Sequence, residues 1–162
     1  MRCFFAVLAV SMVMAPCAWS QNALNLEADN IIGTYYVAYD GEESKVVFTK
    51  EDDGTYKAQT IWVKNCLDEN GEVRKDTKNP DKSMRNVPCN RIVLITGLEY
   101  NQPKHRWDGG KVYDPTRGIR ANATCFFGDD GKFRLKGSLL GFSQTVIWEK
   151  ISSEVEPVPP AE

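Results

Sequence analysis

Apolar and polar side chains alternate through most of residues 31–150, and pairs of Asp-Gly or Asn-Gly interrupt the alternation. A period of two is typical of a β-strand with one buried face, and Gly supplies the positive φ that a tight hairpin turn needs. The sequence therefore predicts a series of antiparallel hairpins and an all-β fold. The pairs stand at Asp40-Gly41, Asp53-Gly54, Asn70-Gly71 and Asp130-Gly131.

The alternation predicts eight strands, at residues 31–39, 45–50, 56–64, 91–98, 106–114, 119–127, 132–137 and 144–150. Most connections are short, but residues 65–89 form one long polar loop between strands three and four. An up-and-down sheet has two open edges unless it closes on itself. We therefore predict an antiparallel up-and-down eight-stranded barrel, in which Gly109-Gly110 mark a bulge or a close backbone approach.

The first 20 residues have the pattern of a secretory signal peptide. Arg2 precedes an apolar run at residues 4–14, and small residues at Ala18 and Ser20 suit a signal peptidase. We expect cleavage after Ser20 and a periplasmic or secreted protein. The apolar run is shorter than the roughly 20 residues of a membrane helix, so no transmembrane segment is expected in the mature chain.

A lipoprotein acylated at Cys17 is an alternative, but Pro16 directly before that cysteine disfavours it. The remaining chain divides into three parts. We expect a short polar lead at residues 21–30, a single barrel domain at residues 31–151, and a tail at residues 152–162. The tail is rich in Pro and Glu and has no apolar period, so it is predicted to be disordered.

Three cysteines remain after the predicted cleavage. Cys66 and Cys89 flank the long loop, and an oxidising compartment would allow a disulfide between them. Such a bridge would close the loop at its base. Cys125 lies in an apolar stripe and is predicted to be a small buried hydrophobic residue.

Composition argues against several classes of function. The formal net charge is −2 at pH 7, without the basic excess that is typical of a nucleic-acid-binding protein. His105 is the single histidine, which gives no support to a His-bearing triad or a multi-His metal site. We predict no catalytic residues, no metal ligands and no cofactor, and hence a non-enzymatic protein.

Aromatic residues fall on the strand faces that the alternation places inward. In a hollow barrel they would bind a small hydrophobic or amphipathic ligand, and in a filled barrel they would be core. The second interpretation describes a protein-interaction module that binds a partner in the cell envelope through the long loop, residues 139–142 and a basic stripe of Arg120, Lys132, Arg134 and Lys136. The predicted ligand-binding residues are Tyr35, Tyr56, Trp62, Trp107, Tyr113 and Trp148.

Two interpretations also remain for the long loop. Asn79, Asp81 and Arg85 are candidates for a recognition tip, because side chains on long loops often carry function. Alternatively, Asn79-Pro80-Asp81 is a local turn in which Asn and Asp bond to nearby backbone groups.

The order of several motifs resembles a known family. Gly33-Thr34-Tyr35 opens the first strand, where lipocalin-like barrels have Gly-x-Trp, and further short motifs follow it in order. The whole set resembles the family of exported bacterial proteins called domain of unknown function 2147, over residues 31–150. The resemblance implies a small lipocalin-like or calycin-type β-barrel and no particular activity. The later motifs are Asn79-Pro80-Asp81, Arg85, Pro88, residues 107–115, Gly118, residues 135–142, Gln144-Thr145 and Trp148.

Overall fold

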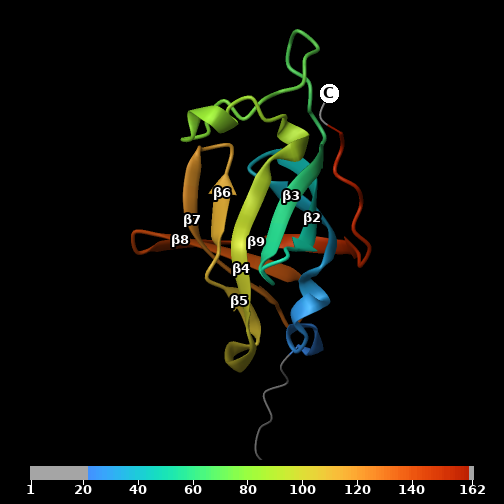
Figure 1. The fold of residues 1–162 in the computed structure, drawn as a ribbon, viewed down its shortest axis with the longest axis vertical. Coiled ribbons are helices and arrows are strands. Elements are labelled where there is room, and N and C mark those ends of the chain that lie inside the picture. The colour runs from blue at the N-terminus through green and yellow to red at the C-terminus, as the bar shows by residue number, and fades with distance from the viewer. Residues whose placement is uncertain (1–21, 161–162) are drawn as a thin grey trace, which may run out of the picture.

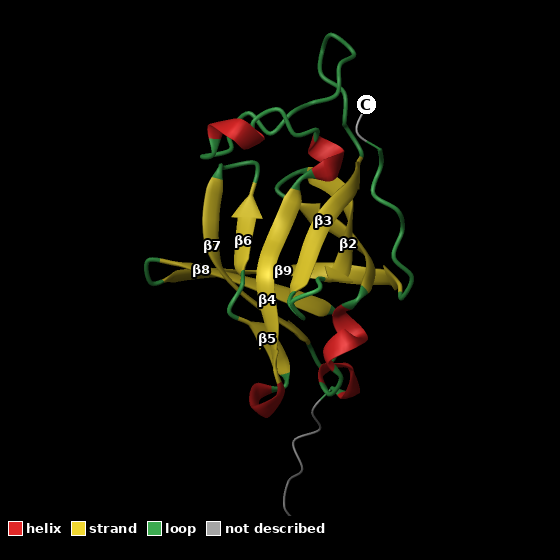
Figure 2. Ribbon diagram, in the orientation of Figure 1, coloured by secondary structure: helices red, strands yellow, loops and turns green. Residues whose placement is uncertain are grey.

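Nine strand segments form one continuous antiparallel sheet in the computed structural model, which describes residues 22–160 (Figures 1 and 2). No helix in this part of the chain is long and apolar enough to cross a membrane. The strands are β1 (Gly33–Tyr39), β2 (Glu42–Lys50), β3 (Tyr56–Val63), β4 (Val93–Asn101), β5 (Arg106–Asp108), β6 (Lys111–Asp114), β7 (Ile119–Phe127), β8 (Phe133–Leu139) and β9 (Phe142–Ser152). The short 3-10 helices are η1 (Ala23–Asn25), η2 (Ala28–Ile31), η3 (Lys82–Met84), η4 (Cys89–Arg91) and η5 (Gln102–Lys104).

The sheet closes into a barrel because β9 pairs with β1. β5 and β6 together occupy one position, since both pair with β4 on one side and with β7 on the other. The barrel therefore has the predicted up-and-down order of eight positions. Gly109 and Gly110 separate β5 from β6. A Cβ atom on Gly110 would lie 2.8 Å from the carbonyl oxygen of Thr96, so the close backbone approach requires glycine.

The glycine break changes which side chains of the fifth predicted strand face inward. Trp107 on β5 is fully buried in the core. On β6 the inward residue is Val112, which pairs with Ala121, whereas Tyr113 pairs with Arg120 on the outer face. The uninterrupted alternation that placed Trp107 and Tyr113 on one inward face is therefore wrong for Tyr113.

A β-bulge on β3 has the same effect on Trp62. Lys45 on β2 pairs with Trp62, but the next residue, Val46, pairs with Thr60, so Ile61 is an extra residue in β3. The bulge shifts the alternation by one residue, which turns Val63 inward, buries the extra residue Ile61 and leaves Trp62 42% exposed. The predicted inward orientation of Trp62 is corrected accordingly.

The N-terminal lead closes one end of the barrel, at the bottom in Figure 1. Four aromatic side chains donate hydrogen bonds to its residues. The Tyr35 hydroxyl donates to the carbonyl of Ile31 (2.7 Å), and the Trp107 indole nitrogen donates to the carbonyl of Ala28 (2.9 Å). The Tyr100 hydroxyl donates to the carbonyl of Asn25 (2.7 Å), and the Tyr56 hydroxyl donates to Asp29 (2.5 Å).

Behind this plug the barrel is filled. Tyr35, Phe48, Phe133 and Trp148 form one cluster in which ring centroids lie 5.0 to 6.2 Å apart. Phe127 extends the cluster from Phe133 to Trp107. Aromatic rings at these separations contribute attraction beyond their buried area. Cys125 is fully buried in the same core, in the environment that the sequence predicts for it.

The other end of the barrel lies under residues 64–92, at the top of Figure 1. This loop contains a small hairpin, in which Leu67 bridges to Val73, and the helices η3 and η4. The described part of the C-terminal segment, for which the sequence predicts disorder, has defined contacts along β1 and β2. The Thr34 hydroxyl donates to the carbonyl of Glu154 (2.8 Å), and Lys45 pairs with Glu156 (3.2 Å).

Replacing Asn25 with Ala is expected to destabilise the fold by about 1–3 kcal/mol, because it leaves backbone groups of a buried strand end unpaired. The Asn25 amide donates to the carbonyl of Phe127 (2.8 Å) and accepts from the Phe127 amide (2.7 Å). Urea unfolding measures the change. Asn30→Ala is the control on the same lead, because the Asn30 bond to Leu24 is exposed; equal losses in both variants would contradict the prediction.

Candidate functional site

A cavity of about 940 Å³ opens at the loop end of the barrel. Its inner wall is almost entirely apolar and comes from the inward faces of eight strands, together with Ile92 just before β4. Trp148 and Leu135 lie at the boundary with the filled half, because both also belong to the aromatic core. The inner lining comprises Val37, Ser44, Thr60, Val63, Ile92, Leu94, Val112, Ala121, Leu135, Gly137, Val146 and Trp148.

Charged lining residues are confined to the rim. They come from the start of β2, from the long loop, and from the end of β6 with the turn that follows it. The two signs are nearly balanced, so the rim has no strong preference for one charge. These residues are Glu42, Asp68, Arg74, Lys75, Asp76, Lys78, Asp114 and Arg117.

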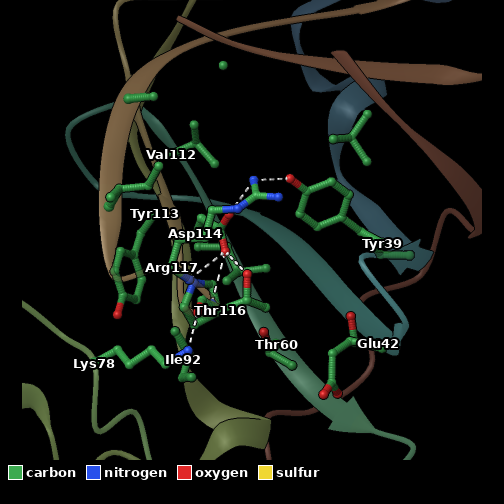
Figure 3. A pocket seen from close by; sticks show the side chains of 18 of the residues that line it. Tyr39, Glu42, Thr60, Lys78, Ile92, Val112, Tyr113, Asp114, Thr116 and Arg117 are labelled. Atoms are coloured by element: carbon green, nitrogen blue, oxygen red, sulfur yellow. Dashed lines mark hydrogen bonds and ion pairs between the residues drawn. The ribbon is translucent and has the colours of Figure 1, made fainter. Parts of the chain in front are cut away.

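Arg117 spans the mouth of the cavity, as Figure 3 shows. It lies in the turn between β6 and β7, and its guanidinium donates a hydrogen bond of 2.6 Å to the Tyr39 hydroxyl at the end of β1. The guanidinium carbon also lies 5.6 Å from the centre of the Tyr39 ring. Asp114 (3.3 Å) and Asp40 (3.4 Å) accept from the same guanidinium, which fixes its orientation. The arginine thus joins two turns from opposite sides of the opening.

The predicted ligand-binding aromatics do not gather in this cavity. Trp148 lines its inner wall and Tyr113 lines it beside the long loop, whereas Tyr35, Tyr56 and Trp107 lie in the filled half. Their polar atoms are already bonded to the N-terminal lead, so they are not available to a ligand. Trp62 lies outside the barrel beside residues 61–67 and Asn90. One half of the barrel is thus filled by the core, and the other half contains the cavity.

Tyr113 fastens the long loop to the outside of the barrel. Its hydroxyl donates a hydrogen bond of 2.7 Å to Asp76, which is buried, and the Asn79 amide donates to the other oxygen of that carboxylate (2.7 Å). Burial, with the neighbouring Asp76, raises the pKa of Tyr113 above its ordinary value, so it stays a donor. Tyr113 therefore shapes the mouth by holding the loop.

Asn79, Asp81 and Arg85 form a local turn within the long loop, which is the second of the two interpretations drawn from the sequence. The Asn79 side chain accepts from the backbone nitrogen of Asp81 (3.0 Å), and Asp81 in turn accepts from the backbone nitrogen of Ser83 (2.9 Å). The Arg85 guanidinium donates to the carbonyl of Asn79 (2.8 Å). These bonds build a turn and begin η3, and none of the three residues lines the cavity.

Two further contacts hold the loop against the rim. Arg74 forms a two-point ion pair with Glu42 (2.9 and 3.1 Å), and the pair lowers the pKa of that carboxylate. The Lys78 amine donates to the carbonyl of Thr116 (2.6 Å). The backbone of Lys78 lies so close to Gly118 that a Cβ atom there would be 2.3 Å from the Lys78 carbonyl oxygen.

Cys66 and Cys89 lie side by side at the base of the loop. Their sulfur atoms are 2.8 Å apart as free thiols, and Cys89 also lines the cavity. Burial raises the pKa of the Cys89 thiol, and the Cys66 thiol raises it further. The predicted disulfide is absent from the structure, but its two partners are adjacent.

Sequence reasoning missed Tyr39, Glu42, Arg74 and Arg117 as rim residues. Nothing in the local pattern shows that turns so distant in sequence meet at one opening. The inner lining was more accessible to prediction, because Val37, Leu135 and Val146 stand at inward positions of the alternation. In residues 22–160 no group of three or more His, Cys, Asp or Glu side chains is arranged to hold a metal ion.

Comparison with known proteins agrees with this architecture. Residues 33–150 match the family described as "Uncharacterized protein conserved in bacteria (DUF2147)". The chain belongs to this family. The resemblance drawn from its motifs is confirmed, and several motif residues now have structural roles: Tyr113 and Gly118 contact the loop from the barrel, whereas Asn79 and Arg85 form bonds within the loop.

A solved structure supports the fold. The chain is similar to the protein HP1028 from the human pathogen Helicobacter pylori, which is described as belonging to the lipocalin family. The two are 23% identical, the TM-score is 0.60, and the match covers 75% of this chain and 83% of that chain. A likeness at this level shows the fold, and it confirms the predicted lipocalin-like barrel. A search of curated proteins found no match.

Gly118→Ala is expected to destabilise the protein more than Gly131→Ala. Both glycines have positive φ, +69° and +73°, so each alanine carries a similar backbone strain of about 1–2 kcal/mol. Only at position 118 does the new methyl group collide with the long loop, since Gly131 has open space. Unfolding in urea and protease cleavage within residues 74–88 measure the additional loss of stability in Gly118→Ala. Identical behaviour of the two variants would show that the contact with Lys78 is dispensable.

Proposed function

We propose that this protein binds a small amphipathic or hydrophobic molecule in the cavity, with the apolar part inside and any polar group at the rim. The observation that carries this proposal is the distribution of charge: the inner wall is apolar, and every charged lining residue lies at the mouth. Burial of apolar ligand surface in a site formed by folding supplies the binding free energy. The lipocalin-like fold is consistent with such a role.

The rim would orient the ligand. The Tyr39 hydroxyl, the Arg117 guanidinium and the Gln144 amide lie together, since Gln144 is 3.3 Å from the Tyr39 hydroxyl. These groups offer both donors and acceptors to a polar ligand end. A ligand passing between them must displace the Arg117–Tyr39 hydrogen bond or move beside it.

We also propose that the protein is exported and works in the periplasm or outside the cell. The signal-peptide pattern of residues 1–20, which lie outside the described part of the structure, supports this placement. The same placement exposes Cys66 and Cys89 to thiol–disulfide oxidants.

Gly137→Phe is expected to abolish ligand binding while the barrel stays folded. Gly137 lines the cavity, and a Cβ atom there would make ordinary contacts with Val112 (3.5 Å) and Ala121 (3.7 Å). The larger ring then occupies the space of the ligand. A fatty acid with bromine atoms on its chain is the probe, and its affinity is expected to fall by about tenfold or more, which corresponds to about 1.4 kcal/mol. Ser138→Phe, the next residue along β8, is the matched control.

Quenching of tryptophan fluorescence reports where the probe sits. Bromine quenches only at short range, so Trp148 is expected to respond and the outward Trp62 is not. The response should persist in Trp62→Phe and disappear in Trp148→Phe. Saturable quenching that survives in both Trp148→Phe and Gly137→Phe would place the ligand elsewhere and refute the proposal.

The exported protein is expected to carry a Cys66–Cys89 disulfide. Each thiol loses one proton and one electron to a disulfide of the oxidising compartment, which is reduced to two thiols. Titration of the unfolded mature chain with a thiol reagent should then find Cys125 alone, and all three cysteines after reduction. By the chain-entropy estimate the bridge contributes about 3 kcal/mol to the free energy of unfolding. Cys66→Ser should therefore lower the stability by this amount under oxidising conditions, and should have no such effect under reducing conditions, where the bridge is absent. Three reactive thiols without reduction would contradict the bridge.

A further inference from the structure

The tip of the β8–β9 hairpin exposes large apolar side chains. Leu140 is 90% exposed and Phe142 is 83% exposed, and Leu139 beside them is half-exposed. We call these three residues the apolar tip. The hairpin projects sideways from the barrel, at the left in Figure 1. Exposed apolar side chains are ordinary when they are scattered, but three at one turn indicate a surface that meets another apolar medium.

The apolar tip extends beyond the last paired residues of the neighbouring strands β7 and β1. β7 pairs with β8 only as far as Asn122 opposite Ser138, and β1 pairs with β9 only as far as Tyr36 opposite Glu149. The β8–β9 pairing continues to Leu139 opposite Phe142. The end of the hairpin therefore has no sheet neighbour on either side, and nothing in the described fold requires apolar residues there.

A second turn of the same molecule shows what folding alone would select. In the β1–β2 turn, Asp40 and Gly41 have φ values of 52° and 81°. In the β8–β9 turn, Leu140 and Gly141 have φ values of 50° and 85°. This left-handed conformation suits Asp, Asn and Gly, which are also polar or small, whereas leucine gains nothing from it. Leu140 thus occupies a left-handed turn position that normally takes Asp, Asn or Gly, and it brings no benefit to folding. Such a departure is typical of a functional position.

Charges near the tip favour a negatively charged partner. No charged residue occurs between Lys136 and Glu149. Lys111, Arg120 and Lys136 are exposed on neighbouring strands, and their register partners place them on one outer face close to the hairpin. Within residues 22–160 none of these three cations forms an ion pair. Acidic groups also lie near Arg120. Hydrogen bonds from Ser83 lower the pKa of Asp81 most and Arg120 lowers it further, and Asp76 and Asp114 adjoin the Tyr113 ring over which Arg120 lies.

We propose that the apolar tip inserts into the surface of an anionic phospholipid bilayer, with Lys111, Arg120 and Lys136 facing the phosphate groups. Short apolar segments flanked by cations bind at the boundary between headgroups and acyl chains, and anionic lipids strengthen the attraction. A second copy of the chain is a poorer occupant, because one turn falls well short of the roughly 800 Å² per partner of a stable interface. The same three cations on each copy would also repel.

Docking would bring the cavity to the membrane. Leu139, Leu140 and Phe142 also line the outer part of the cavity, so the inserted tip would lie beside the mouth. The inference goes beyond ligand binding, because the tip contacts lipid whether or not the cavity is occupied. It also differs from a transmembrane anchor, since only side chains of one turn enter the bilayer.

The test is binding to vesicles. The mature protein is mixed with vesicles of phosphatidylcholine and phosphatidylglycerol, or of phosphatidylcholine alone, and the bound fraction is measured by flotation. Leu140→Asn with Phe142→Ser keeps a turn-compatible residue beside Gly141 and removes two apolar side chains. We expect its partition into the anionic vesicles to fall by about tenfold or more. Leu67→Asn is the control, because Leu67 is also exposed but lies in the long loop.

The contribution of the three cations to vesicle binding can be measured separately from that of the apolar tip. Lys111→Gln with Lys136→Gln is expected to weaken binding to the anionic vesicles, with little change for phosphatidylcholine alone, and added salt should mimic the substitution. Gly137→Phe should still bind vesicles although it loses the brominated fatty acid, so failure of the ligand proposal would leave this one standing. Absence of vesicle binding by the unchanged protein, or equal binding by the tip variant, overturns the proposal. So does a dimer that depends on Leu140 and forms without lipid.

Discussion

Four aromatic side chains in one half of the barrel donate hydrogen bonds to a single short segment, and this arrangement determines which half of the interior is filled. Tyr35, Tyr56, Tyr100 and Trp107 are large enough to fill the barrel, and their polar atoms need partners once buried. Residues 25–31 supply those partners and close the end. The filled half gives the sheet a rigid base, so the other half can remain hollow without collapsing. The packed core and the cavity are thereby separated along the barrel axis.

The loop end depends on a different kind of attachment. Residues 64–92 have few apolar groups to bury, and they are held by polar contacts at named points: Tyr113 to Asp76, Arg74 to Glu42, and Lys78 to Thr116. Of the motif residues, Tyr113 takes part in these contacts. Other motif residues form part of the inner wall, because Val112, Leu135, Gly137 and Trp148 line the cavity beside positions outside the motifs such as Val37 and Val146.

Much of the fold could be predicted from the sequence because it depends on local signals. Alternation and Asp-Gly turns gave the strand order, and the paired glycines gave the break between β5 and β6. The errors at Trp62 and Tyr113 have one cause, since an extra residue at a bulge or break reverses the faces beyond it, and it is visible only against the partner strand. The rim could not be predicted at all, because Arg117 and Tyr39 are 78 residues apart. Alternation also says nothing about depth, so inward aromatics of the plug and of the cavity wall look alike in the sequence.

The fixed floor of the cavity has a consequence for selectivity. Trp148 forms part of that floor and is braced by Tyr35, Phe48 and Phe133, so it cannot recede to admit a longer guest. If the proposed ligand carries an alkyl chain, each added methylene would gain contact until the chain end reaches the indole, and further methylenes would remain in water at the mouth. The distance from the rim to Trp148 would then set the length of hydrocarbon chain that the cavity accommodates.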